Sequence, residues 1–258
     1  MLSTPNADVK ALAGGQSLLP MLNMRIAAPT MLVDLGSIPE LQVLEKRGDE
    51  LVVGAMVRQR KVEIAPLVRD VCPLLPDMLR YVGHVQVRNR GTIGGSIAHA
   101  DPVAELALAG LVMDAAVTLA GPDGRRILSL GDLLVGPYMT AIRDDELLVD
   151  IRFPVTPGRH ASHEVSRRHG DFAVAGVVAF RTASLKPELR LGVMGLGGTP
   201  VRLVDAERLA ASEPDDVGAI VACVVDELSE LGSGWPDIEY RRRVAGALAR
   251  RAIHEVTR

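Results

Sequence analysis

Two glycine pairs are the residues of this sequence whose types and spacing could do chemistry. Gly14 and Gly15 lie within residues 13–17, and Gly94 and Gly95 lie within residues 91–96. Each pair follows an apolar run and has a serine close behind it. Because glycine adopts positive φ and lets a ligand approach the main chain, successive N–H groups can point into one concavity and bind an anion. Two such loops predict a site for a pyrophosphate.

Each pair taken alone is also typical of a tight turn between strands, so both interpretations stay open at this point. Neither pair matches the phosphate-binding signatures GxxxxGK[ST] and GxGxxG. The sequence therefore disfavours both a P-loop and a Rossmann domain.

Composition places the chain among ordinary globular proteins. Its 258 residues, 48% of them hydrophobic, can bury one large core or two small ones. The 29 basic and 32 acidic residues give a net charge of −3 and are spread along the chain, which predicts no nucleic-acid partner. The most apolar stretch, residues 97–119, is interrupted by charged side chains, and the start has no signal-like segment. We expect a cytoplasmic protein without a membrane span.

The reactive side chains form no recognisable catalytic or metal signature. Cys72 and Cys223 match no zinc spacing and are expected to be free thiols, and two cysteines cannot supply the four thiolates of an iron-sulfur cluster. His160, His163 and His169 could bind a metal, but surface or hydrogen-bonding roles fit better because no predicted element aligns them. No GxSxG or HExxH motif occurs. The chain thus offers a binding site for an anion, and a bound ligand would have to supply the reactive group.

The elements that must position the glycine pairs follow from apolar patterning. Strands are predicted at residues 9–12, 32–35 and 51–53, the first leading into the first glycine pair. Residues 65–82 predict a helix that its prolines bend or interrupt. After the second pair, Asp101 as N-cap and Pro102 at the first helical position predict a helix through residue 113.

The remaining elements divide at a proline-rich break. A β-hairpin is predicted around the turn at residues 121–124, and a strand at residues 146–153. Residues 154–158 then stop regular structure and mark a boundary. Beyond it, the sequence predicts a strand pair and two helices, at residues 172–181, 188–194, 216–231 and 238–256. The arginine-rich part of the last helix is a solvated face or a contact to a partner.

Four segments of the sequence resemble segments of a known protein family. Residues 11–25, with Ala-Gly-Gly-Gln-Ser, and residues 87–105, with Thr-Ile-Gly-Gly-Ser and His-Ala-Asp-Pro, resemble the FAD-binding medium subunit of molybdenum hydroxylases, the carbon monoxide dehydrogenase and xanthine dehydrogenase family. Residues 164–173 and 195–202 look like the third and fourth landmarks of that family. The four landmarks stand in the right order and cover most of the chain.

This resemblance implies an α+β fold with a FAD-binding domain of the vanillyl-alcohol-oxidase type (PCMH type). Residues 1–155 would form that domain, in two subdomains, and residues 160–258 a small C-terminal domain of sheet and helices. Family members usually carry a strand and a helix ahead of the first glycine loop, which here follows Met1 after a dozen residues. We therefore expect either a start further upstream or a shortened variant that holds FAD less firmly.

The resemblance also implies roles for individual residues. Those expected to hold the pyrophosphate through the main chain are Ala13, Gly14, Gly15, Gln16, Ser17, Leu18, Thr92, Gly94, Gly95 and Ser96. Those expected around the rest of the cofactor are His99, Asp101 and Glu105 towards the ribityl chain and adenosine, and Leu148 near the flavin ring. For Asp101 a simple capping role stays open. His163 occupies a position where a lysine can lie close to the ring, so we expect it to make the flavin potential depend on pH.

The resemblance implies that the chain is the subunit that carries the flavin in a larger enzyme. It would carry electrons from an iron-sulfur small subunit to an external acceptor, while a molybdopterin large subunit oxidises the substrate, in a dimer of heterotrimers. It would be active only in that complex. Two alternatives remain: a free-standing FAD-dependent oxidoreductase, which would need its own substrate pocket, and a non-enzymatic nucleotide-binding or scaffold module.

Overall fold

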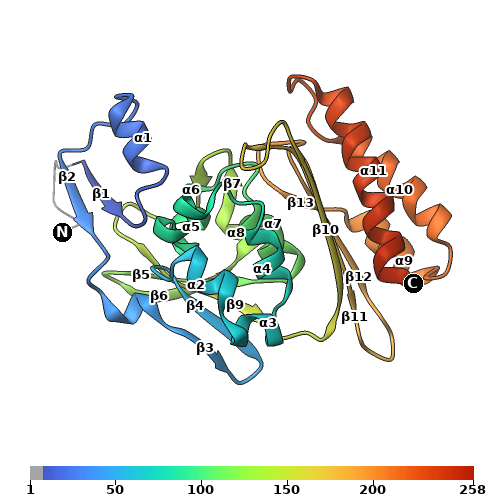
Figure 1. The fold of residues 1–258 in the computed structure, drawn as a ribbon, viewed down its shortest axis with the longest axis horizontal. Helices are drawn as coiled ribbons and strands as arrows, with labels where there is room; N and C mark the ends of the chain where they lie inside the picture. Colours follow the sequence, from blue (N-terminus) through green and yellow to red (C-terminus); the bar gives the residue numbers. More distant parts are fainter. Residues whose placement is uncertain (1–7) are drawn as a thin grey trace.

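The computed structural model describes residues 8–258, and at one end a small lobe stands apart (Figure 1). The lobe consists of β1 (Val9–Leu12), α1 (Leu18–Asn23) and β2 (Met31–Asp34). The two strands pair in parallel, which requires a crossover, and α1 with its flanking loops provides it. The predicted strands at 9–12 and 32–35 are therefore confirmed to within one residue. Their carboxyl ends lie at the same edge.

A five-stranded antiparallel sheet forms the centre of the molecule. Its strands, in spatial order, are β3 (Leu44–Arg47), β4 (Glu50–Gly54), β9 (Leu147–Pro154), β5 (Ala116–Gly121) and β6 (Gly124–Ser129). The helices packed on it are α2 (Gln59–Ile64), α3 (Pro66–Val71), α4 (Leu74–Leu79), α5 (Val85–Arg90), α6 (Ile93–His99) and α7 (Glu105–Val112). The short elements of this central part are η1 (Pro39–Gln42), α8 (Leu130–Leu133), β7 (Leu134–Gly136) and β8 (Met139–Thr140). The main core lies between sheet and helices.

The C-terminal part is a second sheet lying between two layers of helices (Figure 1). Its antiparallel strands are β10 (Gly158–Ser166), β11 (Ala173–Thr182), β12 (Leu189–Met194) and β13 (Val201–Arg202). Its outer helices are α9 (Val204–Ser212), α10 (Val217–Glu230) and α11 (Ile238–Thr257). Because side chains alternate along a strand, Val178 and Phe180 of β11 join the main core, whereas Val177 and Ala179 join a second core under the outer helices.

Most predicted elements are present, and one prediction is wrong. The hairpin, the strand at 146–153, the strand pair and both closing helices appear at or near the predicted positions. The helix expected at residues 65–82 is divided into α3 and α4 by Cys72 and Pro73. Asp101 does not begin a helix. Ala100 adopts left-handed φ and ends α6, and Asp101 accepts the Val103 N–H at 3.0 Å, which delays the start of α7 to Glu105.

Strand β10 has no counterpart among the predicted elements. Its sequence is polar, with His160, Ser162, His163 and Glu164 in its middle. Most of these side chains are half-buried, because both faces of the strand are covered by helices that also carry polar groups. Alternation of polar and apolar residues, the usual signal of a strand, is therefore lost.

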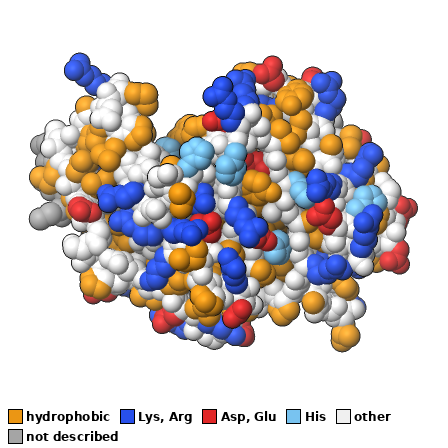
Figure 2. Space-filling view, viewed as in Figure 1, with side chains coloured by type: hydrophobic (Ala, Val, Ile, Leu, Met, Phe, Trp, Pro, Cys, Tyr) orange, Lys and Arg blue, Asp and Glu red, His pale blue; other side chains and the backbone are white. Residues whose placement is uncertain are grey.

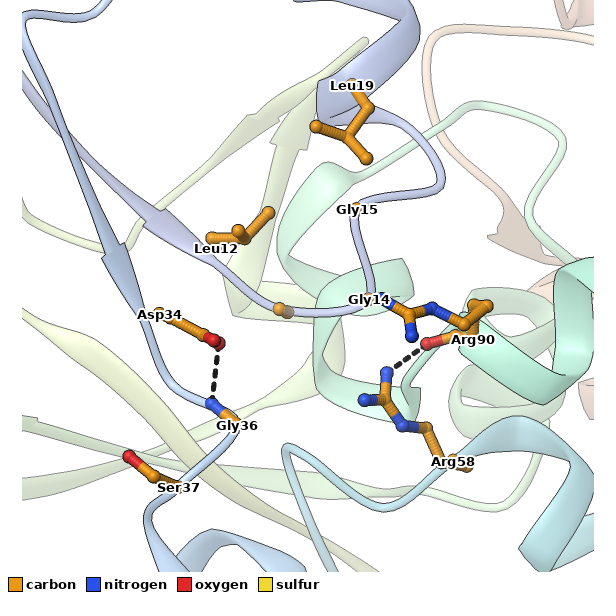
Figure 3. Close-up of a pocket in the computed structure, with 10 residues that line it drawn as sticks. Leu12, Gly14, Gly15, Leu19, Asp34, Gly36, Ser37, Arg58 and Arg90 are labelled. Carbon is orange, nitrogen blue, oxygen red and sulfur yellow. Dashed lines mark hydrogen bonds between the residues drawn. The ribbon is translucent and has the colours of Figure 1, made fainter.

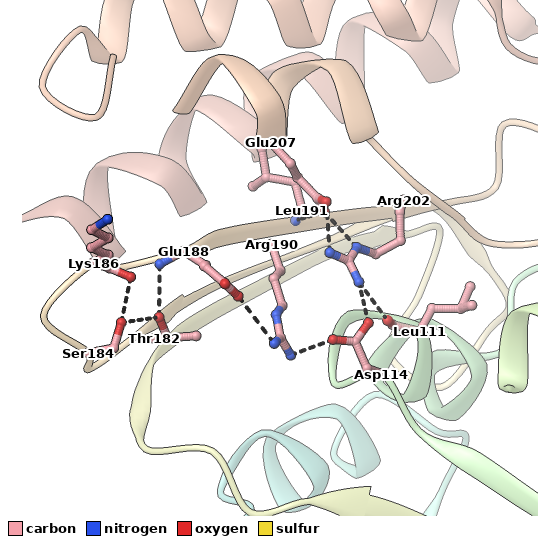
Figure 4. A network of polar contacts seen from close by, with 10 residues as sticks. All are labelled: Leu111, Asp114, Thr182, Ser184, Lys186, Glu188, Arg190, Leu191, Arg202 and Glu207. Atoms are coloured by element: carbon pink, nitrogen blue, oxygen red, sulfur yellow. Dashed lines mark hydrogen bonds and ion pairs between the residues drawn. The ribbon is translucent and has the colours of Figure 1, made fainter. Parts of the chain in front are cut away.

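An ionic cluster joins the C-terminal sheet to the central helices (Figure 4). Asp114, in the turn between α7 and β5, lies 2.6 Å from an Arg202 Nη1 and 2.8 Å from an Arg190 Nη1. Arg202 also pairs with Glu207 of α9 through Nε at 2.6 Å. One carboxylate thus connects two arginines of neighbouring strands, and the cluster fixes the sheet against α7.

We expect Asp114→Asn to weaken this junction. Asn keeps the left-handed backbone of this position, where φ is 52°, but removes the charge that two largely buried guanidinium groups share. The free energy of unfolding should fall by roughly 1 kcal/mol, because Asp114 itself is half-exposed and the attraction is screened by solvent. Thermal melting should show this as a loss of about 2–4 °C. Asp123→Asn in the exposed hairpin turn is the control and should leave the melting temperature unchanged.

Candidate functional site

A polar cleft of about 410 Å³ opens at the first glycine pair, where β1 and β2 end (Figure 3). Its walls come from the N-terminal lobe and from the segments before α2 and α6. The residues lining it are Leu12, Ala13, Gly14, Gly15, Leu19, Asp34, Gly36, Ser37, Arg58 and Arg90. In the space-filling view, Lys and Arg side chains gather in a band where the lobe meets the rest of the molecule (Figure 2). The cleft is therefore open to solvent and electropositive on one side.

The first glycine loop presents main-chain donors to this cleft. Gly15 has a φ of 75°, the left-handed conformation that favours glycine. No described residue accepts the N–H groups of Gly14, Gly15 or Gln16, so these donors are available to a ligand. Gly14 is also required for packing, because a Cβ there would lie 2.5 Å from the carbonyl oxygen of Arg90. This geometry suits an anion and agrees with the cradle predicted for this loop.

The second glycine pair differs from the first in its hydrogen bonding, and its role as a second cradle stays a prediction. Gly94 and Gly95 lie in the first turn of α6, and their N–H groups are already bound inside the chain. The Gly94 N–H donates to the carbonyl of Ala55, and the Gly95 N–H donates to Oγ1 of Thr92, both at 3.0 Å. The Ser96 N–H donates to the carbonyl of Thr92 at 3.2 Å. Helix formation uses the donors that a loop would have left free.

The second pair instead serves the close approach of two segments. A Cβ on Gly94 would lie 2.4 Å from the Cβ of Ala55, and one on Gly95 would lie 3.2 Å from the Cβ of Ala13. Larger residues at these positions would push the start of α6 away from β4 and from the first glycine loop. Gly95 therefore supports the cleft by packing against the first loop.

Two arginines that the sequence analysis did not select complete the cleft. Arg58 precedes α2 and Arg90 ends α5, and both line the cleft (Figure 3). The Arg58 guanidinium donates to the main-chain carbonyl of Arg90, which holds the two segments together. Arg88, two residues earlier, is buried in an ion pair with Glu63 at 2.9 Å and has a structural role. The available signal was the pair of arginines, separated by Asn89, just before Gly91, but only the fold shows which of them is buried and which lines the cleft.

His99, Asp101 and Glu105 come together near the other end of α6. The ring of His99 lies 5.1 Å from that of Tyr138, and burial lowers the pKa of His99. Burial raises the pKa of Glu105 to about 8, and the nearby carboxylates of Glu164 and Asp101 act in the same direction. These residues do not line the cleft at the first glycine loop. Helix α6 connects the two groups, since at 1.5 Å per residue His99 lies about 6 Å beyond Gly95.

Glu164 faces this group from β10, and sequence reasoning gave it no role of its own. Its Oε2 is buried and has no hydrogen-bond partner among the described residues. Burial raises the pKa of Glu164 to about 7. The carboxyl groups of Glu105 and Glu164, both with raised pKa values, therefore lie near each other where the C-terminal sheet packs on the central helices.

Leu148 and His163, the two residues expected near the flavin ring, do not line the cleft at the first glycine loop. Leu148 on β9 is 5% exposed and packs in the main core, whereas its neighbour Val149 packs beneath the first glycine loop with Leu35. Strand alternation therefore turns Leu148 away from the cleft. His163 lies with its Nε2 3.2 Å from Glu255 of α11, on the outer face of β10. The pH-dependent flavin potential expected through His163 stays a prediction.

The remaining histidines and the two cysteines lie in separate surroundings. His160 contacts Asp77 at 2.9 Å and His169 contacts the ring of His84, so the three sequence-neighbouring histidines point to different partners. Within residues 8–258, no group of His, Cys, Asp and Glu could hold a metal ion. Both cysteines are free thiols, and no described helix is long and apolar enough to cross a membrane.

We expect Glu105→Gln to remove a pH dependence of stability. Because its pKa is raised on folding, Glu105 binds its proton more tightly in the folded than in the unfolded chain, so its contribution to stability is full below pH 4.5 and is lost as the pH rises to about 8. The flavin-free Gln variant should melt at the wild-type temperature at pH 5 and at a higher one at pH 8. Equal pH slopes in both proteins would contradict the assignment. Glu213→Gln at an exposed position is the control.

Comparison with known proteins identifies the family. Residues 1–156 match the model of the FAD binding domain in molybdopterin dehydrogenase. The chain is 38% identical to the nicotine 6-hydroxylase medium subunit of Paenarthrobacter nicotinovorans, covering 99% of this chain and 92% of that subunit. It is 33% identical to the carbon monoxide dehydrogenase medium chain of Hydrogenophaga pseudoflava, covering 98% and 91%.

Solved structures give the same result over nearly the full length. The crystal structure of quinoline 2-oxidoreductase from Pseudomonas putida 86 superimposes with a TM-score of 0.91 at 30% identity, covering 98% of this chain and 90% of that chain. Carbon monoxide dehydrogenase from Hydrogenophaga pseudoflava superimposes with a TM-score of 0.90 at 31% identity, covering 99% and 91%. The chain therefore belongs to the FAD-binding medium subunits of the molybdenum hydroxylases, the carbon monoxide dehydrogenase and xanthine dehydrogenase family.

Proposed function

We propose that this chain carries FAD between an iron-sulfur subunit, which delivers electrons, and an external acceptor, which removes them. The observation that carries this proposal is the open set of N–H donors at Gly14 to Gln16, flanked by the guanidinium groups of Arg58 and Arg90. Such a site fits the pyrophosphate of a dinucleotide cofactor. Bound FAD supplies chemistry that no side chain of the chain can supply, namely the exchange of electrons singly or in pairs.

The residues of the chain bind and orient this cofactor. The main chain of residues 13–18 receives the pyrophosphate, and Arg58 and Arg90 offset its charge. Gly95 and Thr92 act indirectly, by holding α6 against the first loop. His99, Asp101 and Glu105, near the far end of α6, would lie towards the ribityl chain and adenosine.

The subunits that complete the enzyme are part of the proposal. Relatives of the chain are medium subunits or medium chains of larger complexes. We assign the clusters to a small subunit, because two cysteines, one of them buried with a pKa raised to about 12, cannot ligate a cluster here. A large molybdopterin subunit oxidises the substrate, and the complex is a dimer of such heterotrimers.

Another subunit, and not this chain, determines which substrate the enzyme oxidises. Relatives of similar identity belong to enzymes named for nicotine, caffeine and carbon monoxide, molecules with no common recognition chemistry. A subunit that recognised the substrate would differ more strongly between such enzymes. A free-standing oxidoreductase would also require acid and base groups around the cofactor. The lining of the cleft holds only Asp34 as a carboxylate, beside two arginines.

We expect the isolated chain to bind one FAD without a covalent bond and to oxidise no organic substrate by itself. Acid precipitation should release the flavin into the supernatant, where its absorbance gives the ratio of flavin to chain. Addition of the iron-sulfur and molybdopterin subunits should restore turnover. An isolated chain that oxidised an organic substrate would favour the free-standing oxidoreductase.

We also expect Gly95→Val to empty the cofactor site. Its side chain would meet Thr92 and Ala13 and displace the first loop, so the affinity for FAD should fall at least about tenfold, the loss of one or more charge-assisted hydrogen bonds. Gly197→Val is a matched control, because no atom lies within 4 Å of a Cβ at that position. Fluorescence titration of the flavin-free variants measures both affinities. Wild-type affinity in the Gly95→Val protein would show that this packing does not support the site.

A further inference from the structure

We propose that the carboxyl groups of Glu164 and Glu105 together take up a proton when the cofactor is reduced and release it when the cofactor is oxidised again. This inference rests on the proposed function and adds a role for Glu164, to which the resemblance assigns none. The observation that carries it is the Oε2 atom of Glu164, which is enclosed by the protein and has no hydrogen-bond partner among the described residues. A carboxylate is costly in such a place, whereas a protonated carboxyl group carries no charge.

Strand β10 places Glu164 on the face that packs on the central helices (Figure 1). Because side chains alternate along a strand, Glu164 shares this face with His160, which contacts α4. His163 lies on the opposite face, where it contacts Glu255 of α11. Glu164 is therefore turned towards the central helices, and its charge acts on Glu105 at the start of α7.

The surroundings of Glu164 offer little to stabilise a negative charge. The residue opposite Glu164 on β11 is Gly176, where a Cβ would lie 2.4 Å from Met194 Cε. The apolar side chain of Met194 thus occupies the space beside the carboxyl group. The hydroxyl of Tyr81 donates to the main-chain carbonyl of Ser162 at 3.2 Å and not to Glu164. The structure therefore supplies neither a donor nor a cation for this carboxylate.

The two glutamates form a coupled pair that binds a proton near neutral pH. Burial raises the pKa of Glu164 to about 7 and that of Glu105 to about 8. Because the two charges repel each other, the proton belongs to the pair and not to one residue. Neither pKa is lowered by a cation among the described residues. The other titratable groups on the elements packed around the pair are Asp77, Arg80 and Tyr81 at α4, Asp101 before α7, His160 on β10 and Arg251 on α11.

Electrons that arrive on the cofactor would shift the proton equilibrium of the pair. By the proposed function, Glu105 lies towards the ribityl chain, so added negative charge acts on the pair through surroundings that hold little water. The pair responds by binding a proton from solvent, which converts a carboxylate into a carboxylic acid. A two-electron reduction then takes two electrons from the iron-sulfur subunit and two protons from solvent, one for the cofactor and one for the pair. Oxidation by the external acceptor removes both electrons and releases both protons.

Proton uptake during reduction of the FAD-loaded 258-residue chain tests this inference. Electrochemical reduction in weakly buffered solution with a pH indicator counts the protons bound per flavin at pH 5 and pH 8. The proteins compared are the wild type, Glu164→Gln and Glu164→Asp. Infrared spectra of the reduced minus the oxidised protein detect the carbonyl stretch of a newly protonated carboxyl group.

The matched control is Glu255→Gln. This variant removes a carboxylate from the opposite face of the same sheet, where a hydrogen bond from Arg251 lowers the pKa of Glu255 and keeps it ionised throughout this pH range. It should bind as many protons as the wild type at both pH values. Circular dichroism melting establishes that each variant is folded.

At pH 8 the wild type should bind about one proton more per flavin than Glu164→Gln, and the carboxyl band should be absent from that variant. At pH 5 the two proteins should bind the same number, because Glu164, with a pKa of about 7, is already protonated before reduction. Glu164→Asp should restore part of the uptake because it keeps a carboxyl group. A purely structural role of Glu164 would change the melting temperature and not the number of protons bound on reduction.

Equal proton uptake by the wild type and Glu164→Gln at pH 8 would overturn this inference and leave the proposed function intact. An infrared pH titration of the flavin-free chain gives a second result that does not require FAD. There the wild type should lose a carboxyl band between pH 5 and pH 8 that Glu164→Gln lacks, and absence of that band would also overturn the inference. Failure of the wild type to bind FAD is a different result, because it contradicts the proposed function and this inference with it.

Discussion

The contact between the first glycine loop and the segment that joins α5 to α6 is the constraint on which the site depends. Gly14 packs against the carbonyl of Arg90, where a Cβ would lie only 2.5 Å from the oxygen, and Gly95 packs against Ala13, where a Cβ would lie 3.2 Å from the Ala13 Cβ. This approach places the N-terminal lobe next to two arginines from the central part of the molecule. Neither the lobe nor the central part would form an anion site alone.

The same contact explains why two similar glycine motifs have different roles. In the first, the chain leaves a strand and makes a turn at positive φ, so its N–H groups stay free. In the second, Thr92 caps a helix and the N–H groups are satisfied internally. Glycine is needed in both, for conformation and ligand approach in one and for packing in the other.

The C-terminal sheet contributes to the site through its position between two helical layers. Strand β10 directs Glu164 towards Glu105, whereas His163, one residue earlier, faces α11. The cluster of Asp114, Arg190 and Arg202 then fixes the sheet against α7. The carboxyl groups at this junction are kept from water and have raised pKa values because the layers are held in contact.

Local sequence determined much of this protein. Apolar patterning specified most strands and the long closing helices, because their burial follows the strand and helix periods. The glycine motifs and the count of two cysteines specified a cofactor cradle without a cluster. The tertiary structure decided what depends on distant residues: which glycine pair keeps its donors, which of Arg88 and Arg90 lines the cleft, and which face of a strand Leu148 and His163 occupy. These features depend on hydrogen-bond partners and on strand orientation. Local sequence does not determine them, because the partners lie tens of residues away in the chain.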